Sequence, residues 1–418
     1  MSRFLQFSGM FILHYAIAMS ALDHADAKGT AFTVLYAFQG GTDGSNPHST
    51  LIEDLEGNLY GTTYSGGANG SGTVFSVAQS GVESILYSFC AQTNCPDGAY
   101  PTAGVIADNE GNLYGTTSQG GAGCDPTGCG TVFKVTAGGT EFVLHAFNGC
   151  SIDGSTADGA IPFAGLFADR QGNLYGTTVA GGGNCSDTTN YGTVYEVAPD
   201  GAEYFGSFDG IDGAAPYGAI REVTPGAFYG VTSGGTFQKC SYGCVYTDLP
   251  TQNPGVVYPF CSQPNCSDGA NPYAGLVADS ANNLYGTTEY GGGRCGCGVV
   301  FKIVPNDMVE TVLYTFTGGK DGAYPASDLI MDKAGNLYGT TTSGGGNHCD
   351  GHGCGTIFKL SSSGSFETLH SFKGSDGAAP YAGLLADKSG NLYGTTAQGG
   401  GTGCGGAGCG TVFALKKK

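Results

Sequence analysis

Basic residues are scarce in this chain of 418 residues, where 16 lysines and arginines stand against 35 aspartates and glutamates. The resulting net charge of −19 argues against nucleic acid and anionic membrane surfaces as partners, because both are bound through patches of Lys and Arg. The three lysines at 416–418 are expected to form a solvated tail rather than such a patch.

Long apolar runs and helical periodicity are both absent after residue 27. No later segment has the length of a membrane span, and no stretch repeats apolar residues at the helical period. Charged residues make up only 12% of the chain, whereas glycine accounts for 77 residues that cluster between short β-type runs. This composition favours many short strands joined by turns.

The one apolar run, at 4–22, follows Arg3 and precedes a small-x-small cleavage motif at 25–27. This order predicts a signal peptide over 1–27 and a mature chain over 28–418. A membrane anchor is the alternative, but the apolar core is short and interrupted by polar residues. We therefore expect a secreted or periplasmic protein that is not inserted in a membrane after cleavage.

The string Leu-Tyr-Gly-Thr-Thr recurs along the chain at intervals of 53 to 61 residues. A period of this size is typical of a solenoid, a propeller or an array of small domains. The copies begin at Leu59, Leu113, Leu174, Leu284, Leu337 and Leu392, with a degenerate copy at Phe228.

The second repeat unit divides into four β-type runs, at 102–108, 112–117, 130–136 and 140–147. Short turns with Asn and Gly separate the first two runs and the last two, and a long Gly-rich loop lies between the pairs. Four short antiparallel strands in about 55 residues correspond to one blade of a propeller.

The two ends of the mature chain supply complementary strands. Residues 31–38 match the fourth strand of a unit, whereas residues 410–415 match a third strand. The sequence therefore predicts an all-β fold, a seven-bladed β-propeller of four-stranded antiparallel blades closed by the N-terminal strand. An open solenoid is the alternative, but neither end resembles its polar caps. Strand alternation then places the tight turns on one face of the disc and the long loops on the other.

With these motifs in hand, the chain resembles the bacterial GloVer tandem-repeat proteins, which carry repeated "LYGTT … GTVF" units. The resemblance spans the predicted mature chain and implies an exported extracellular repeat protein. It brings no catalytic residues, and the absence of a visible sorting motif favours a free form. Third-strand matches lie at 72–75, 130–133, 192–195, 355–358 and 410–413.

An Asp-Gly pair precedes the first strand of every blade, which predicts a circle of seven carboxylates on the long-loop face. Such a ring could bind a hard cation such as Ca²⁺. The alternative, which we favour, is that each Asp caps a turn while its Gly adopts positive φ. The seven are Asp43, Asp97, Asp158, Asp212, Asp268, Asp321 and Asp376.

All 16 cysteines lie in the predicted long loops, and export favours disulfides over zinc ligation. The one-residue spacing of Cys295 and Cys297 makes this pair the least certain, because so short a bridge is strained. Cys150 and Cys185 have no near neighbour and are predicted to pair across blade three, with two unpaired thiols as the alternative. The remaining pairs are Cys90/Cys95, Cys124/Cys129, Cys240/Cys244, Cys261/Cys266, Cys349/Cys354 and Cys404/Cys409.

Departures from the repeat concentrate in the fourth and fifth blades, where Arg221, Glu222, Lys239, Glu289 and Arg294 are the candidate ligand-binding residues. Surface drift explains them equally well. No nucleophile–base–acid set stands out, and the histidines of the fourth strands are expected to be packing residues.

We expect a monomeric, non-enzymatic propeller that needs no cofactor and binds an extracellular carbohydrate or protein ligand through its long-loop face. A propeller-type lyase or hydrolase, with a metal-assisted site at the channel mouth, is the alternative. A purely structural surface protein is the third hypothesis. An enzyme would require a few unique polar residues that converge, whereas these loops are nearly identical.

Overall fold

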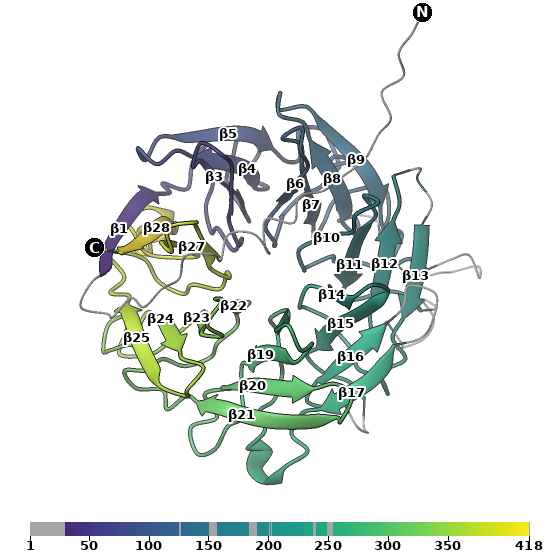
Figure 1. Ribbon diagram of the computed structural model, residues 1–418. Helices are drawn as coiled ribbons and strands as arrows, with labels where there is room; N and C mark the ends of the chain where they lie inside the picture. The colour runs from purple at the N-terminus through teal and green to yellow at the C-terminus, as the bar shows by residue number, and fades with distance from the viewer. Residues whose placement is uncertain are drawn as a thin grey trace, which may run out of the picture.

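The computed structural model describes residues 30–124, 127–149, 157–183, 190–199, 201, 203–236, 240–248 and 254–417. Its strands form seven four-stranded antiparallel sheets that surround a central axis as blades (Figure 1). The protein is therefore an all-β, seven-bladed β-propeller, as predicted. The signal peptide predicted over 1–27 lies outside the described residues.

The blades are numbered in chain order, and the first strand of each is innermost. Blades 1 to 3 contain β2 (Ile52–Glu53), β3 (Leu59–Thr63), β4 (Thr73–Val77) and β5 (Glu83–Ser88); β6 (Ile106–Ala107), β7 (Leu113–Thr117), β8 (Thr131–Val135) and β9 (Glu141–Ala146); β10 (Phe167–Ala168), β11 (Leu174–Thr178), β12 (Thr193–Val197) and β13 (Glu203–Ser207). Blades 4 and 5 contain β14 (Arg221–Thr224), β15 (Ala227–Thr232), β16 (Cys244–Asp248) and β17 (Gly255–Pro259); β18 (Val277–Ala278), β19 (Leu284–Thr288), β20 (Val299–Val304) and β21 (Val309–Thr315). Blades 6 and 7 contain β22 (Ile330–Met331), β23 (Leu337–Thr341), β24 (Thr356–Leu360) and β25 (Phe366–Ser371); β26 (Leu385–Ala386), β27 (Leu392–Thr396), β28 (Thr411–Lys417) and β1 (Thr30–Ala37). Two short 3-10 helices, η3 (Pro264–Cys266) and η4 (Cys404–Gly406), lie in long loops.

Blade 7 closes the ring, because the N-terminal strand β1 pairs with the C-terminal strand β28. The two strands lie side by side in Figure 1, and Thr30 is opposite Lys417. This confirms the predicted closure. It also corrects the expectation of a solvated lysine tail, since Lys416 and Lys417 belong to β28.

The glycine of the Leu-Tyr-Gly-Thr-Thr strand faces an aromatic residue of the next strand in every blade. Gly115, for example, pairs with Phe133, whose side chain is fully buried. A Cβ at Gly115 would lie 2.6 Å from the Phe133 Cζ, so the ring occupies the space that a larger residue would fill. The Gly–aromatic pair thus explains why the two motifs recur together. The other pairs are Gly61–Phe75, Gly176–Tyr195, Gly230–Tyr246, Gly286–Phe301, Gly339–Phe358 and Gly394–Phe413.

The two threonines of the motif have different partners. The first reaches the next blade: the Thr395 hydroxyl donates to the Ser49 carbonyl at 3.0 Å and so ties blade 7 to blade 1. The second contacts the third strand of its own blade, as in Thr117 and Thr131, whose hydroxyl oxygens are 2.8 Å apart. The motif therefore encodes contacts both within a blade and between blades.

The first strands are shorter than predicted. The sequence predicts a strand over 102–108, but only Ile106 and Ala107 pair with β7. The preceding residues instead contact the first segments of neighbouring blades, where a Cβ at Gly104 would overlap the Thr50 carbonyl oxygen. Near the axis, the first segments of neighbouring blades therefore pack against one another instead of pairing with the second strand of their own blade.

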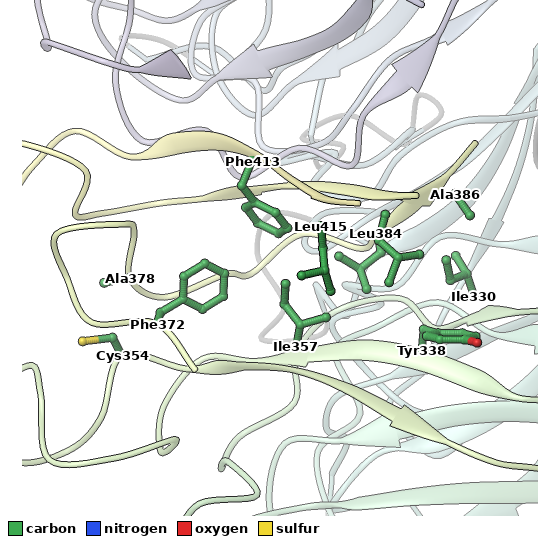
Figure 2. Packing of buried hydrophobic residues seen from close by; sticks show 11 residues of the cluster. Ile330, Tyr338, Cys354, Ile357, Phe372, Ala378, Leu384, Ala386, Phe413 and Leu415 are labelled. Atoms are coloured by element: carbon green, nitrogen blue, oxygen red, sulfur yellow. The ribbon is translucent and has the colours of Figure 1, made fainter. Parts of the chain in front are cut away.

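Seven apolar clusters fill the spaces between consecutive blades. Figure 2 shows the cluster between blades 6 and 7, in which Ile357 and Phe372 meet Phe413 and Leu415. These side chains are at most 3% exposed. The hydrophobic core is thus a ring of interfaces around the axis.

Candidate ligand-binding site at the channel mouth

A cavity of about 950 Å³ occupies the centre of the ring and is lined by residues of all seven blades. Its walls are the first strands and the segments that lead into them from the long loops. A site of this size falls within the range typical of small-molecule pockets.

Aromatic side chains surround the long-loop end of this cavity in two arcs. The first arc comprises Phe163, Tyr217 and Tyr273 of blades 3 to 5, with ring centroids 5.0 and 4.8 Å apart. The second arc begins at Tyr381 of blade 7, which stacks on His48 of blade 1 with centroids 5.2 Å apart.

The second arc continues outward from the cavity through Tyr64 and Tyr100, with successive centroids 5.9 and 5.2 Å apart. Burial lowers the pKa of His48 to about 4, so its imidazole is neutral at physiological pH. Both arcs therefore present uncharged ring surfaces, and most of their side chains are only half-buried.

One position of the repeat, the residue after the proline that follows each Asp-Gly pair, supplies the five rings that line the cavity: His48, Phe163, Tyr217, Tyr273 and Tyr381. Tyr64 and Tyr100, by contrast, lie directly after Thr63 and directly before Pro101. At the first of these positions blade 2 carries Thr102 and blade 6 carries Ala326, so these two blades contribute no aromatic ring to the long-loop end of the cavity. The sequence analysis did not predict this site. The proline-aromatic pattern is visible in the sequence, but the sequence does not show that this position lies close to the axis of the propeller.

Asp328 lies below the long-loop end of the cavity, which we call the mouth, at a position that is glycine in four other blades. Its Oδ1 accepts a hydrogen bond from the Gly275 N–H at 2.6 Å. Burial raises the pKa of Asp328, and the Gly275 N–H and the Arg221 guanidinium oppose this effect. The charge of Arg221 thus offsets part of the cost of burying the Asp328 carboxylate within the cavity.

Glu289 lies at the mouth itself, beside the gap left by Ala326. Burial raises the pKa of its carboxyl, and a hydrogen bond from Tyr290 opposes the rise. The neighbouring ring of Tyr290 is 43% exposed, so it is available to a ligand.

Three of the five predicted ligand-binding residues, Arg221, Glu222 and Glu289, line the central cavity. Glu222 also accepts a hydrogen bond from the Gly226 N–H at 2.8 Å, as the turn-capping aspartates do in other blades. Arg294 is exposed in its loop and does not line the cavity. Lys239 lies outside the described residues.

The seven Asp-Gly aspartates cap turns beside the outermost strands, away from the cavity. Asp97 is typical: its Oδ2 accepts hydrogen bonds from the Ala91 N–H at 2.9 Å and the Tyr87 hydroxyl at 2.8 Å. Within the described part of the chain, no three His, Cys, Asp or Glu side chains are grouped to hold a metal ion. Binding of Ca²⁺ by Asp43, Asp97, Asp158, Asp212, Asp268, Asp321 and Asp376 stays a prediction.

A second kind of acidic site lies between the outer strands of adjacent blades. His145 contacts both the Asp158 carboxylate, at 3.1 Å, and the Glu203 carboxylate, at 2.6 Å. Burial alone would lower the pKa of His145, but the two carboxylates outweigh it and raise the pKa. His145 is therefore more than a packing residue.

The equivalent interface between blades 7 and 1 carries a glutamate without a histidine. Burial and the charge of Asp43 raise the pKa of Glu83 to about 7. Its Oε1 atom is buried and has no hydrogen-bond partner. This carboxyl therefore destabilises the interface when it ionises.

Seven disulfides lie in the long loops, and the described cysteines include no free thiol. They include the least certain prediction, Cys295–Cys297. Cys150 and Cys185 lie outside the described residues, so their pairing stays a prediction. The other bridges are Cys90–Cys95, Cys124–Cys129, Cys240–Cys244, Cys261–Cys266, Cys349–Cys354 and Cys404–Cys409.

The fold and its repeated motifs define a disulfide-bonded β-propeller repeat protein. The chain belongs to the Gloeobacter/Verrucomicrobia repeat family, whose model matches residues 21–189 and 184–413. No curated protein is significantly similar to it in sequence. No helix of the described residues is long and apolar enough to cross a membrane.

Solved structures support the fold alone. The extracellular domain of a one-component system from B. thetaiotaomicron matches with a TM-score of 0.53 and 13% identity over 93% of this chain. This chain spans only 40% of that protein's chain. An oligogalacturonate lyase in complex with manganese matches with a TM-score of 0.53 and 9% identity, covering 93% of this chain and 97% of the lyase.

Proposed function

We propose that this protein is an exported, non-catalytic propeller that binds an extracellular glycan at its long-loop mouth. Disulfides are typical of proteins from oxidising compartments, which supports export. The observation that carries the proposal is the pair of aromatic arcs on either side of the central cavity.

The chemistry of a sugar ring suits these arcs. One face of a pyranose carries axial C–H groups that pack against an aromatic ring, while its hydroxyls need polar partners at the edge. Tyrosine supplies both an apolar face and a hydroxyl. Tyr217, Tyr273 and Tyr381 also lose little conformational freedom on binding, because their neighbours already hold their rings.

A concave site favours a glycan over a folded protein as the ligand. The cavity is enclosed by residues of all seven blades, so a chain terminus or a single sugar unit enters it more readily than a flat protein surface. The loops around it are braced by disulfides such as Cys261–Cys266, which keeps the mouth preorganised.

Glycan-array screening of the mature protein, followed by calorimetry, tests the proposal. We expect Tyr217→Ala and Tyr273→Ala each to weaken binding about tenfold, because each removes a stacking face worth roughly 1–1.5 kcal/mol. Tyr242→Ala is the matched control, since Tyr242 is 50% exposed and lies outside the cavity. Equal binding by all three variants, or no glycan binding at all, contradicts the proposal. Turnover of the bound glycan would instead support the lyase or hydrolase alternative.

A further inference from the structure

Glu289 is the only charged residue at its position in the repeat, directly after the Leu-Tyr-Gly-Thr-Thr strand. This position lies near the mouth, so the single acidic substitution breaks the symmetry of the ring there. The equivalent residues are Tyr64, Ser118, Val179, Ser233, Thr342 and Ala397.

Three tyrosines line the central cavity together with Glu289: Tyr273, Tyr290 and Tyr381. Tyr290 is its neighbour in the sequence, and the Glu289 N–H donates to the Asn271 carbonyl at 3.1 Å, two residues before Tyr273. Tyr381 occupies the repeat position equivalent to Tyr273, and the small side chain of Ala326 occupies that position in the blade between them. Burial raises the pKa of all three tyrosines, and the negative charge of Glu289 raises each further. One carboxylate and three tyrosines therefore line this sector of the cavity.

The charge of Glu289 is not matched by a basic side chain. Among the residues that the structure describes, Glu289 forms no ion pair. Arg294 belongs to the same loop but is exposed and does not line the cavity. The charge of Asp328, by contrast, is offset in part by Arg221 within the cavity. Glu289 therefore leaves a half-buried negative charge at the mouth of the cavity for a ligand to match.

We propose that the enclosure formed by Tyr273, Tyr290, Tyr381 and Glu289 is a subsite for an ammonium group. The cation would lie against the tyrosine faces, which attract positive charge through their quadrupoles, with Glu289 as its counter-charge. This inference rests on the proposed function and deepens it: the preferred glycan carries a primary or quaternary ammonium substituent. The net charge of −19 also favours the approach of a cationic ligand.

Choline and its uncharged isostere 3,3-dimethyl-1-butanol, titrated separately into the mature protein by calorimetry, test the subsite. They have the same shape and differ in charge, so desolvation of apolar surface contributes equally to both. We expect choline to bind at least tenfold more tightly than the isostere to the wild type. Glu289→Gln should abolish this preference. Glu56→Gln is the control, because Glu56 is an exposed carboxylate at the tight-turn end of the same cavity.

Equal affinity for the two probes, no binding of choline, or an unchanged preference in Glu289→Gln overturns the subsite. Glycan binding, measured with the same protein preparations, distinguishes a failure of the ammonium subsite from a failure of the proposed glycan-binding function. If an uncharged glycan binds and choline does not, the subsite is wrong and the proposed function stands. If neither glycan nor choline binds, both are wrong. The circular dichroism spectrum of Glu289→Gln should match that of the wild type.

Discussion

Replacement of Gly115 by alanine tests the packing rule that links the two repeated motifs. The added Cβ would lie 2.6 Å from the Phe133 Cζ, 3.0 Å from its Cε1 and 3.2 Å from the Val105 Cγ1. Carbon atoms prefer separations of about 3.5–4.0 Å, so the phenyl ring would have to move by roughly 1 Å. Phe133 is fully buried and packs against Phe89 with ring centroids 4.9 Å apart, which leaves little room for that movement.

Overpacking of this kind typically costs about 1–3 kcal/mol, and we expect Gly115→Ala to lower the free energy of unfolding by that amount. Urea unfolding measures the change as a shift in midpoint at constant slope. Gly138→Ala is the matched control in the same blade: Gly138 has no positive φ, and the closest atom to its added Cβ is the Thr136 Oγ1 at 3.8 Å. The control should be neutral or slightly stabilising, because alanine restricts the unfolded chain.

A double-mutant cycle with Phe133→Leu isolates the clash. Leucine removes the ring edge that Gly115→Ala meets, so the double variant should be less destabilised than the sum of the two single variants. A neutral Gly115→Ala, or strict additivity in the cycle, would refute the steric explanation of the motif.

Three further predictions concern buried polar groups. Thr395→Val should lower the free energy of unfolding in urea by about 1 kcal/mol, because the Thr395 hydroxyl donates a hydrogen bond to the next blade. Thr287→Val is the control and should not destabilise the protein, because the Thr287 hydroxyl is buried without a hydrogen-bond partner. The raised pKa of His145 means that the protonated imidazole stabilises the folded protein. This stabilisation is complete at pH values below the unfolded-state pKa of 6.5, and it is lost as the pH rises through the folded-state pKa. The stability of the wild type relative to His145→Tyr should therefore fall as the pH rises above 6.5; a constant difference would contradict the ion-pair assignment. Since the pKa of Glu83 is raised from 4.5 to about 7, its ionisation should destabilise the fold as the pH rises over that interval, and Glu83→Gln should flatten this part of the stability profile.

The spacing of the repeats, the number of strands and the closure of the ring could all be predicted from the sequence. These features depend on local rules: period-two alternation, turn residues, and a motif whose copies all face the same environment. Because strands alternate in direction, the same reasoning also assigned the cysteines to one face. Residues such as Gly115 and Thr117 have partners in their own blade, so their roles follow from a single repeat.

The candidate site depended on the tertiary structure. Tyr381 and His48 stack although 333 residues separate them in the sequence, because ring closure brings blades 7 and 1 together. The Asp-Gly aspartates repeat as regularly as the aromatic positions, yet they cap turns beside the outer strands. A repeat pattern determines that a position recurs around a circle, but only the packing of the blades determines the radius of that circle. For this reason the sequence by itself determined the ring, whereas the distance of each side chain from its axis was decided by the packed structure.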